Sequence, residues 1–217
     1  MLKRIPHTSQ DITGQLKTEE YVQNHEKHAR IQFKAFLTEL TRQQRRYRLL
    51  SNGRFLEIGS GPGFLTALIA DQYPKAEMNA LELSPDMISI AKTVVNRTQP
   101  SSRVRFIEGN VDDRSLMARL GKFDLIFSTF SLHHWEHPVQ AMKAMYRALK
   151  EGGLMMLHDL KRVPWLYLLP TQNGFITSIR AAYRPFEIKR MISEAKINDF
   201  KIKTAFPYFW YTLLIGK

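Results

Sequence analysis

The sequence predicts an α/β fold in which a mostly parallel sheet is covered by helices. A short β-prone run at residues 54–58 leads into a glycine-rich turn at 59–63, and from Phe64 onward apolar residues recur at helical spacing. A second β-prone run covers residues 77–83. Residues 123–127 are mostly apolar, as expected of a parallel strand that is buried on both faces. Strands that alternate with helices in this way are typical of α/β proteins.

The turn at 59–63 indicates what kind of ligand the protein binds. Its three glycines alternate with other residues, unlike a phosphate-binding P-loop, and no lysine or arginine lies between Arg54 and Lys75. Glycines let the main chain pass close to a ligand, beside the unpaired N–H groups of the following helix. A nucleoside triphosphate would therefore find no cation at this turn.

Two acidic residues accompany the turn. Glu57 precedes the first glycine by two residues, where a carboxylate would repel a pyrophosphate but could accept hydrogen bonds from a cationic group. Glu82 ends the second strand, at the distance downstream at which an acid binds ribose hydroxyls in nucleotide-binding folds. We therefore expect a ligand that carries a ribose and a positive charge but no phosphate.

The rest of the sheet is predicted from local signals. Ser84 can cap a helix that starts at Pro85, and the glycines at 152–153 can end another helix. Further elements are expected as a strand at 104–110, a helix at 139–150, a strand at 154–157, a helix at 186–195 and two strands around Pro207.

The segment after the fourth strand is the expected reaction site. Ligands bind at the carboxyl ends of strands in open α/β sheets, and residues 128–135 occupy that position. His133 and His134 lie in this segment, where an imidazole could accept a proton from a substrate. No metal site is predicted, because adjacent residues on an irregular segment seldom share a metal and no carboxylate completes a ligand set.

The two flanks of the chain carry less regular patterns. Residues 1–18 are expected to form a loosely ordered lead-in, and residues 19–50 two helices. Residues 161–185 combine aromatic side chains with arginines. This composition favours a lid that covers an apolar body and holds an anionic group, although a helix pair with ordinary surface arginines fits the same pattern.

Composition limits the class of protein. A chain of 217 residues suits one α/β domain with extra elements. The absence of cysteine excludes disulfides, thiolate metal sites and cysteine nucleophiles. No apolar run of about 18 residues occurs, and the start of the chain lacks the apolar segment of a signal peptide, so we expect a soluble cytoplasmic protein.

The net charge of +12 is concentrated at both ends of the chain. Residues 1–50 hold ten basic and five acidic residues, residues 51–157 twelve and eleven, and residues 158–217 ten and four. Basic flanks around a nearly neutral centre favour an anionic partner, such as a carboxylate or phosphate substrate. A basic, solvated surface that only aids solubility is the alternative.

Three stretches resemble the class I S-adenosylmethionine-dependent methyltransferases, in particular the small-molecule type 11/25 group. They are LEIGSGPGFLT, ALELSPDMI and FDLIFSTFSLHHWEHPVQAMKAMYRALKEGGLMML. The resemblance implies a Rossmann-like, doubly wound sheet of seven mostly parallel strands with a reversed last strand. It also implies an N-terminal helical cap at 1–50, a methyltransferase domain at 51–217, and a substrate lid at 161–185 between strand five and the last helix.

The resemblance implies S-adenosylmethionine as the cofactor and S-adenosylhomocysteine as the product. Tyr21 would close over the methionine end of the cofactor, although a core tyrosine fits equally well. Asn110 stands where the family usually has an aspartate that binds the adenine amino group; in a shifted register Asp112 or Asp113 would take this role. The implied cofactor-binding residues are Glu57, Gly59, Ser60, Gly61, Gly63, Glu82, Leu83, Met87, Asn110, Val111, Ser128 and Tyr21.

The acceptor site is less clearly marked. His133 and His134 are the candidate catalytic bases, with His133 preferred, while one of the pair has a structural role. The candidate substrate contacts are His158, Arg162, Arg180 and Tyr183.

The predicted function is transfer of a methyl group to an O, N or C atom of a small, anionic acceptor. Two alternatives remain: methylation of RNA or protein through the basic flanks, and a catalytically inactive homologue that binds the cofactor. Methylation of base amino groups is disfavoured, because STFS replaces the expected NPPY-type tetrapeptide after strand four. The sequence does not indicate an oligomeric state.

Overall fold

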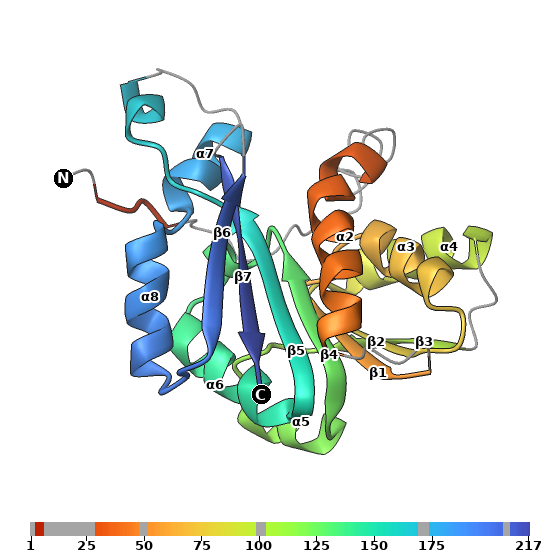
Figure 1. Ribbon diagram of the computed structural model, residues 1–217. Coiled ribbons are helices and arrows are strands. Elements are labelled where there is room, and N and C mark those ends of the chain that lie inside the picture. The colour runs from red at the N-terminus through yellow and green to blue at the C-terminus, as the bar shows by residue number, and fades with distance from the viewer. Residues whose placement is uncertain (1–2, 7–28, 48–51, 99–102, 169–173, 206–208) are drawn as a thin grey trace.

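A seven-stranded sheet lies between two layers of helices in the computed structural model, which describes residues 3–6, 29–47, 52–98, 103–168, 174–205 and 209–217 (Figure 1). The strand order is β3-β2-β1-β4-β5-β7-β6. Neighbouring strands from β3 to β5 are parallel, whereas β7 is antiparallel to both β5 and β6. The predicted Rossmann-like, doubly wound sheet with a reversed last strand is confirmed.

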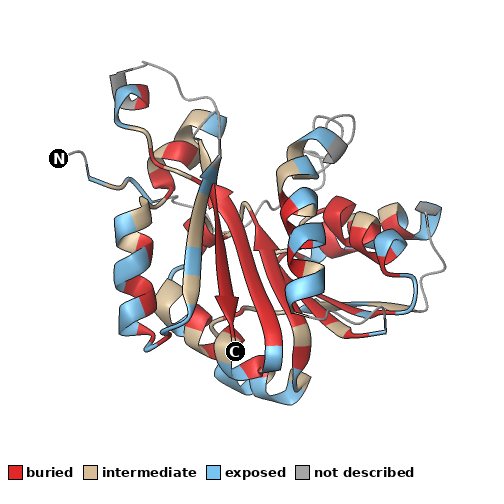
Figure 2. Ribbon diagram, viewed as in Figure 1, coloured by how far each residue is buried: buried red, intermediate tan, exposed pale blue. Residues whose placement is uncertain are grey.

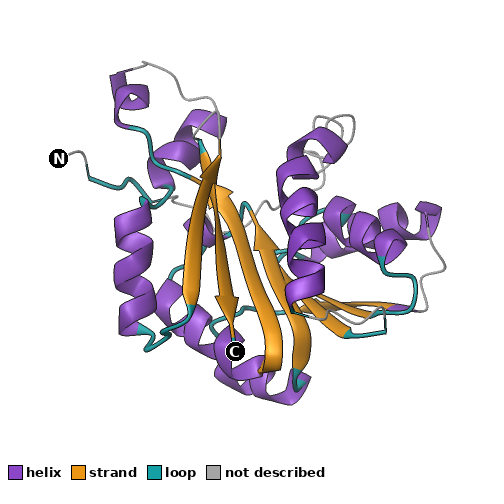
Figure 3. Cartoon of the chain, viewed as in Figure 1, coloured by secondary structure: helices purple, strands orange, loops and turns teal. Residues whose placement is uncertain are grey.

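Helices and strands alternate along the first half of the chain, after the N-terminal helix α2 (Figure 3). The elements are α2 (Ala29–Arg46), β1 (Arg54–Ile58), α3 (Phe64–Gln72), β2 (Glu77–Glu82), α4 (Pro85–Thr98), β3 (Val104–Glu108) and α5 (Arg114–Leu120). The predicted cap of α4 forms, because the N–H of Met87 donates to Ser84 Oγ over 3.3 Å.

The second half completes the sheet. Its elements are β4 (Phe123–Thr129), the 3₁₀ helix η2 (Leu132–His134), α6 (Pro138–Ala148), β5 (Leu149–Leu160), the 3₁₀ helix η3 (Pro164–Leu168), α7 (Gly174–Ala181), α8 (Pro185–Glu194), β6 (Phe200–Ala205) and β7 (Trp210–Gly216).

Strand β5 is longer than the sequence predicts. The predicted strand at 154–157 is its centre, and the glycines at 152–153 lie inside β5 instead of ending the preceding helix. The pairing with β4 starts at Leu149 and shifts register before it resumes at Leu154. Gly152 has a φ of +76° in this irregular part, a value that favours glycine. A local break in pairing therefore produces the same glycine signal as a helix end.

The two faces of the sheet bury separate apolar cores, and strands β1, β2, β4, β5 and β7 are mostly buried, whereas the edge strands β3 and β6 are not (Figure 2). Side chains of α2 and α3 cover one face, where Phe36 and Leu40 of α2 are fully buried. Side chains of α6 and α8 cover the other. Of the two helices predicted in residues 19–50, α2 is one; the first of them lies outside the described residues.

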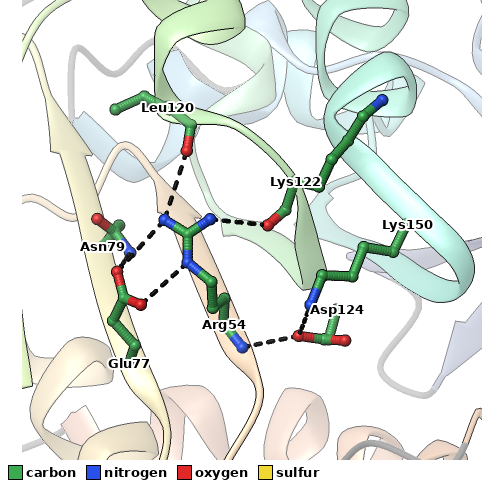
Figure 4. Close-up of polar contacts among 7 residues, drawn as sticks. All are labelled: Arg54, Glu77, Asn79, Leu120, Lys122, Asp124 and Lys150. Carbon is green, nitrogen blue, oxygen red and sulfur yellow. Dashed lines mark hydrogen bonds and ion pairs between the residues drawn. The ribbon is translucent and has the colours of Figure 1, made fainter.

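A polar network ties the strands together at the end of the sheet opposite the glycine-rich turn (Figure 4). The Arg54 guanidinium donates to both carboxylate oxygens of Glu77, at 2.9 and 3.3 Å, and to the carbonyl oxygen of Lys122 at 3.1 Å. This hydrogen bonding from Arg54 lowers the pKa of the Glu77 carboxyl. Asp124 accepts from the Arg54 N–H and from Lys150 Nζ, each at 2.8 Å. The polar groups at this end are therefore paired within the protein.

No helix in the described parts of the chain combines the length and the apolar composition needed to cross a membrane.

Candidate active site

The turn between β1 and α3 needs glycine at three positions. Gly59, Gly61 and Gly63 have φ values of +70°, +51° and +78°, which side chains with a Cβ rarely adopt. A Cβ on Gly59 would lie 2.4 Å from Ser131 Oγ, and one on Gly63 would lie 2.8 Å from Ala91 Cβ. A Cβ on Gly61 would meet no heavy atom within 4 Å. The main chain at Gly61 therefore faces open space, where a ligand can approach it closely.

Glu82 is held against this turn by main-chain donors. Its Oε2 accepts from the N–H of Gly61 over 2.8 Å, and its Oε1 accepts from the N–H of Ser84 over 3.0 Å. An ionised carboxylate can accept about four hydrogen bonds, so capacity for ligand hydroxyls remains. Two further predicted cofactor-binding residues lie near the start of α4: Leu83 is 38% exposed, whereas Met87 is buried.

Glu57 is a buried acid below the turn. Its carboxylate oxygen Oε2 accepts from the hydroxyl of Thr66 over 2.5 Å. Burial raises the pKa of the Glu57 carboxyl from 4.5 to about 8; the Thr66 hydrogen bond opposes this shift and the nearby Glu82 charge adds to it. Without a ligand, Glu57 is therefore mostly neutral at pH 7. A cationic group placed beside it would favour the ionised form.

Two serines lie at the same edge of the sheet. Ser60 Oγ is buried and has no hydrogen-bond partner among the described residues. A polar atom in that state calls for a ligand or a water. Ser128 Oγ, also buried, donates to the carbonyl oxygen of Ile58 over 2.7 Å and thereby joins the ends of β4 and β1.

Asn110 occupies a turn after β3. Its side-chain oxygen accepts from the N–H of Asp112 over 3.0 Å, which leaves its amide NH₂ and one lone pair for a ligand. Asp113 caps α5, with its Oδ1 accepting from two N–H groups at 2.8 and 3.0 Å. Val111 is buried. Of the two aspartates considered for a shifted register, Asp113 is thus already engaged.

The two histidines of η2 lie beside the end of β5. His133 Nδ1 is 2.7 Å from Asp159 Oδ1, and the His133 N–H donates to Asp159 Oδ2 over 3.0 Å. Both side chains are buried. With Nδ1 donating to the carboxylate, Nε2 is the basic nitrogen of the neutral imidazole. His134 is partly exposed, and its ring centroid lies 4.1 Å from that of His133.

The pairing of His133 with Asp159 was not predicted from the sequence. They are 26 positions apart in the sequence. His133 lies in η2, which follows β4, and Asp159 lies near the end of β5. Strands β4 and β5 are parallel neighbours, so their carboxyl ends lie side by side. Combining the strand order with the strand ends would have indicated this contact.

His158 is surrounded by aromatic rings. Phe130 and Trp210 have ring centroids 5.3 and 6.2 Å from it, and Phe36 lies 6.3 Å away. Its Nδ1 lies 2.8 Å from Thr212 Oγ1, while its buried Nε2 has no partner in the described parts of the chain. Burial lowers the pKa of His158 to about 4, so the ring is neutral near pH 7.

Phe130 marks a strained position between β4 and η2. Its φ of +53° is unusual for a residue with a side chain. Such strain costs about 1 to 3 kcal/mol and is often found at functional sites. The strained residue places its ring between Phe33 of α2, at 6.2 Å between centroids, and His158.

The arginines predicted to bind substrate make contacts within the protein. Arg162 is buried, and its Nη2 donates to Glu187 Oε1 over 2.6 Å while its Nη1 donates to the carbonyl oxygen of Ala182 over 3.2 Å. Arg180 Nη2 donates to the carbonyl oxygen of Leu166 over 3.3 Å. Both arginines thus hold the segment between β5 and α8 in place.

An N-terminal residue that the sequence did not single out reaches this site. Arg4 donates through Nε to the carbonyl oxygen of Ala181 over 2.5 Å and through Nη2 to that of His133 over 2.7 Å. Its guanidinium lies 4.3 Å from the ring centroid of Tyr183. Residues 3–6 are thus docked on the protein, which differs from the loosely ordered lead-in that was predicted.

Tyr21 lies outside the described residues. Within the described ranges, no three His, Cys, Asp or Glu side chains come together as a metal ion would require.

Residues 55–153 match a family model described as a methyltransferase domain. The chain is 35% identical over 103 residues to a malonyl-[acyl-carrier protein] O-methyltransferase from Paenibacillus sp., a match that covers 48% of this chain and 37% of that protein. It is 28% identical over 120 residues to a ubiquinone biosynthesis O-methyltransferase from Xanthomonas oryzae, covering 55% of this chain and 48% of that protein. The chain thus spans less than half the length of these curated relatives.

Solved structures share the fold over nearly the whole chain. The plantazolicin methyltransferase BpumL, in complex with a triazolic desmethylPZN analog and SAH, superposes with a TM-score of 0.71 at 16% identity, covering 93% of this chain and 90% of that one. A SAM-dependent methyltransferase from Aquifex aeolicus gives a TM-score of 0.67 at 15% identity, covering 94% of this chain and 98% of that one. At these identities the similarity concerns the fold.

Proposed function

We propose that the chain is a class I S-adenosylmethionine-dependent methyltransferase and that it transfers a methyl group to an O, N or C atom of a small, anionic acceptor. The main support is the pairing of Gly61 with Glu82. The glycine leaves open space beside the main chain, and the carboxylate is oriented by two N–H groups with capacity left for hydroxyls. This arrangement fits a ligand with a ribose and no phosphate.

Several residues at the same edge of the sheet would hold the cofactor. Glu82 would bind the ribose hydroxyls, and Glu57 would face the cationic amino group. Ser60 Oγ, buried and without a partner among the described residues, could donate to the carboxylate. When bound, S-adenosylmethionine supplies a methyl group on a positively charged sulfur that a nucleophile can displace. Asn110 and Met87 are proposed to contact the adenine.

His133 is proposed to accept the proton of the acceptor. Asp159 orients the imidazole through the 2.7 Å contact to Nδ1, which makes Nε2 the proton-accepting atom. The carboxylate also stabilises the imidazolium that forms. Both groups are buried, so neighbouring side chains would have to move before an acceptor could reach Nε2.

The acceptor is proposed to carry a negative charge. The basic excess of the chain lies in residues 1–50 and 158–217, on either side of the nearly neutral central stretch of the sequence. Residues 1–50 and 161–185 would form the N-terminal cap and the lid over this acceptor. Relatives are named for malonyl-[acyl-carrier protein] and ubiquinone biosynthesis, and a malonyl group carries a carboxylate. Positive flanks around a neutral cofactor site would attract such a group.

A methyl-transfer assay tests the proposal directly. The protein would be incubated with methyl-labelled S-adenosylmethionine and a panel of aromatic and aliphatic carboxylates and phosphates, and the label would be followed into product. We expect turnover of at least one acceptor by wild type and by Glu151→Ala, an exposed acid at the far end of β5. We expect none by Glu82→Ala. Equal turnover by both variants, or none by folded wild type, would refute the proposal.

A further inference from the structure

A cavity of about 570 Å³ opens between the segment that leaves β5 and the start of α8. In Figure 1 this segment runs from the top of β5 to the upper left, past the upper end of α8. The glycine-rich turn lies at the ends of β1 and β2, on the other side of β4 and β5 in the sheet order. The cavity is lined by Lys161, Arg162, Val163, Pro164, Arg184, Pro185, Phe186 and Lys189.

The polar lining of this cavity is entirely cationic. Four lining residues are lysine or arginine, and none is acidic. The nearby acid, Glu187, is turned to other partners: its Oε1 accepts from Arg162 Nη2 over 2.6 Å, and its Oε2 accepts from the N–H of Arg184 over 2.7 Å. The side chains of Arg184 and Lys189 have no acidic partner among the described residues. Of the four lining cations, Arg162 is the one whose side chain pairs with Glu187.

The buried arginine in the wall points to a ligand. Arg162 is only 3% exposed, and its Nε, also buried, has no acceptor in the described parts of the chain. A buried guanidinium that is incompletely paired is costly, and an added anion would offset part of that cost. Arginine also matches the two oxygens of a carboxylate or phosphate.

The other half of the lining is apolar. Phe186 is 51% exposed although it is a large aromatic residue next to the helix start, and two prolines and a valine complete this side. Prolines at 164 and 185 have no N–H groups to offer a polar ligand. An aromatic or aliphatic body would remove this surface from water.

We propose that this cavity binds an organic anion, a phosphate or carboxylate whose adjoining part is apolar, at a position separate from the methyl-transfer site. The charged group lies against Arg184, Lys189 and the wall formed by Arg162, and the apolar part covers Phe186. The anion is either a distal group of the methyl acceptor or a separate small molecule.

Binding of phenyl phosphate and of inorganic phosphate, measured by calorimetry on the full chain, tests the site. We expect the double variant Arg184→Glu/Lys189→Glu to bind phenyl phosphate at least about tenfold more weakly than wild type, because two attractive charges become repulsive. The control Lys75→Glu/Lys201→Glu makes the same change in net charge outside the cavity and keeps wild-type affinity. Phe186→Ala weakens phenyl phosphate but leaves inorganic phosphate unchanged. No binding by folded wild type, or equal binding by both double variants, overturns the proposal.

Methyl-transfer kinetics decide whether the anion belongs to the acceptor or to a separate molecule. This second experiment rests on the proposed methyl transfer. If the anion belongs to the acceptor, Arg184→Glu/Lys189→Glu raises KM for the acceptor at least about tenfold with little change in kcat. If it is a separate molecule, KM is unchanged while phenyl phosphate binding is lost. Because phenyl phosphate is measured without cofactor, failure of the cavity proposal and failure of the methyltransferase proposal give different results.

Discussion

Replacing Glu57 with glutamine would show how a buried acid couples protonation to stability. Burial raises its carboxyl pKa from 4.5 to about 8, whereas in the unfolded chain the group titrates near 4.5. Between these values the folded protein binds one more proton than the unfolded chain. The stability from this group is therefore fully present below about pH 4.5 and is lost as the pH rises through about 8, at about 1.4 kcal/mol per pH unit.

Glu57→Gln should lack this dependence of stability on pH. Glutamine is neutral at every pH and can still accept the Thr66 hydrogen bond, so the packing around residue 57 is kept. Between about pH 6 and about pH 7.5 we expect the free energy of unfolding of wild type to fall by about 2 kcal/mol more than that of Glu57→Gln. Urea unfolding followed by circular dichroism at both pH values measures the difference. Parallel changes in the two proteins would show that Glu57 is already ionised in the folded state.

Ligand binding should release the proton that the Glu57 carboxyl holds in the free protein. A cationic amino group beside Glu57 would favour its carboxylate, so S-adenosylhomocysteine should release close to one proton from wild type near pH 7. Calorimetric titration in two buffers with different ionisation enthalpies gives the number of protons released. Glu57→Gln should release almost none, and an equal release from both proteins would contradict this role for Glu57.

Three other substitutions test the site. Gly61→Ala should lower the free energy of unfolding by about 1 to 2 kcal/mol, because φ at Gly61 is +51° but a Cβ there would meet open space. The variant should also bind S-adenosylhomocysteine at least about tenfold more weakly. Thermal unfolding measures the first effect and calorimetry the second, and unchanged affinity would place the ligand elsewhere. Asp159→Asn should reduce kcat by about a hundredfold or more and alter its pH profile while S-adenosylhomocysteine affinity stays the same, and an unchanged kcat would exclude a base role for His133. Arg4→Gln should lower the free energy of unfolding by about 1 to 2 kcal/mol in urea, because two hydrogen bonds and a ring contact are lost; no change would mean that residues 3–6 add no stability.

The turns and helix starts around the sheet could be predicted because the residues that form them are close together in the sequence. The glycines at 59–63 require positive φ values in the structure, and Ser84 does cap the helix after β2. Prediction failed at residues 152–153, where glycines accompany a shift in pairing inside β5 and no local signal separates this from a helix end.

Long-range contacts were the part that the sequence did not reveal. Arg4 binds carbonyl groups 129 and 177 positions away, and any residue can supply a carbonyl, so no side-chain pattern marks these partners. Arg162 was predicted to contact an anionic substrate, and that stays a prediction. Its pairing with Glu187 through Nη2 was not predicted, because a basic residue beside an apolar segment does not indicate its partner. The cofactor side depends on short local turns and was easier to predict than the acceptor side, which is assembled from distant segments.

Calorimetric titration with S-adenosylhomocysteine is the most direct test of the central claim, that the turn at Gly61 and the carboxylate of Glu82 form a cofactor site. We expect wild type and Glu151→Ala to bind with micromolar affinity, and Glu82→Ala to show no measurable binding while circular dichroism confirms that it is folded. Absence of binding to folded wild type, or unchanged affinity in Glu82→Ala, would contradict the claim.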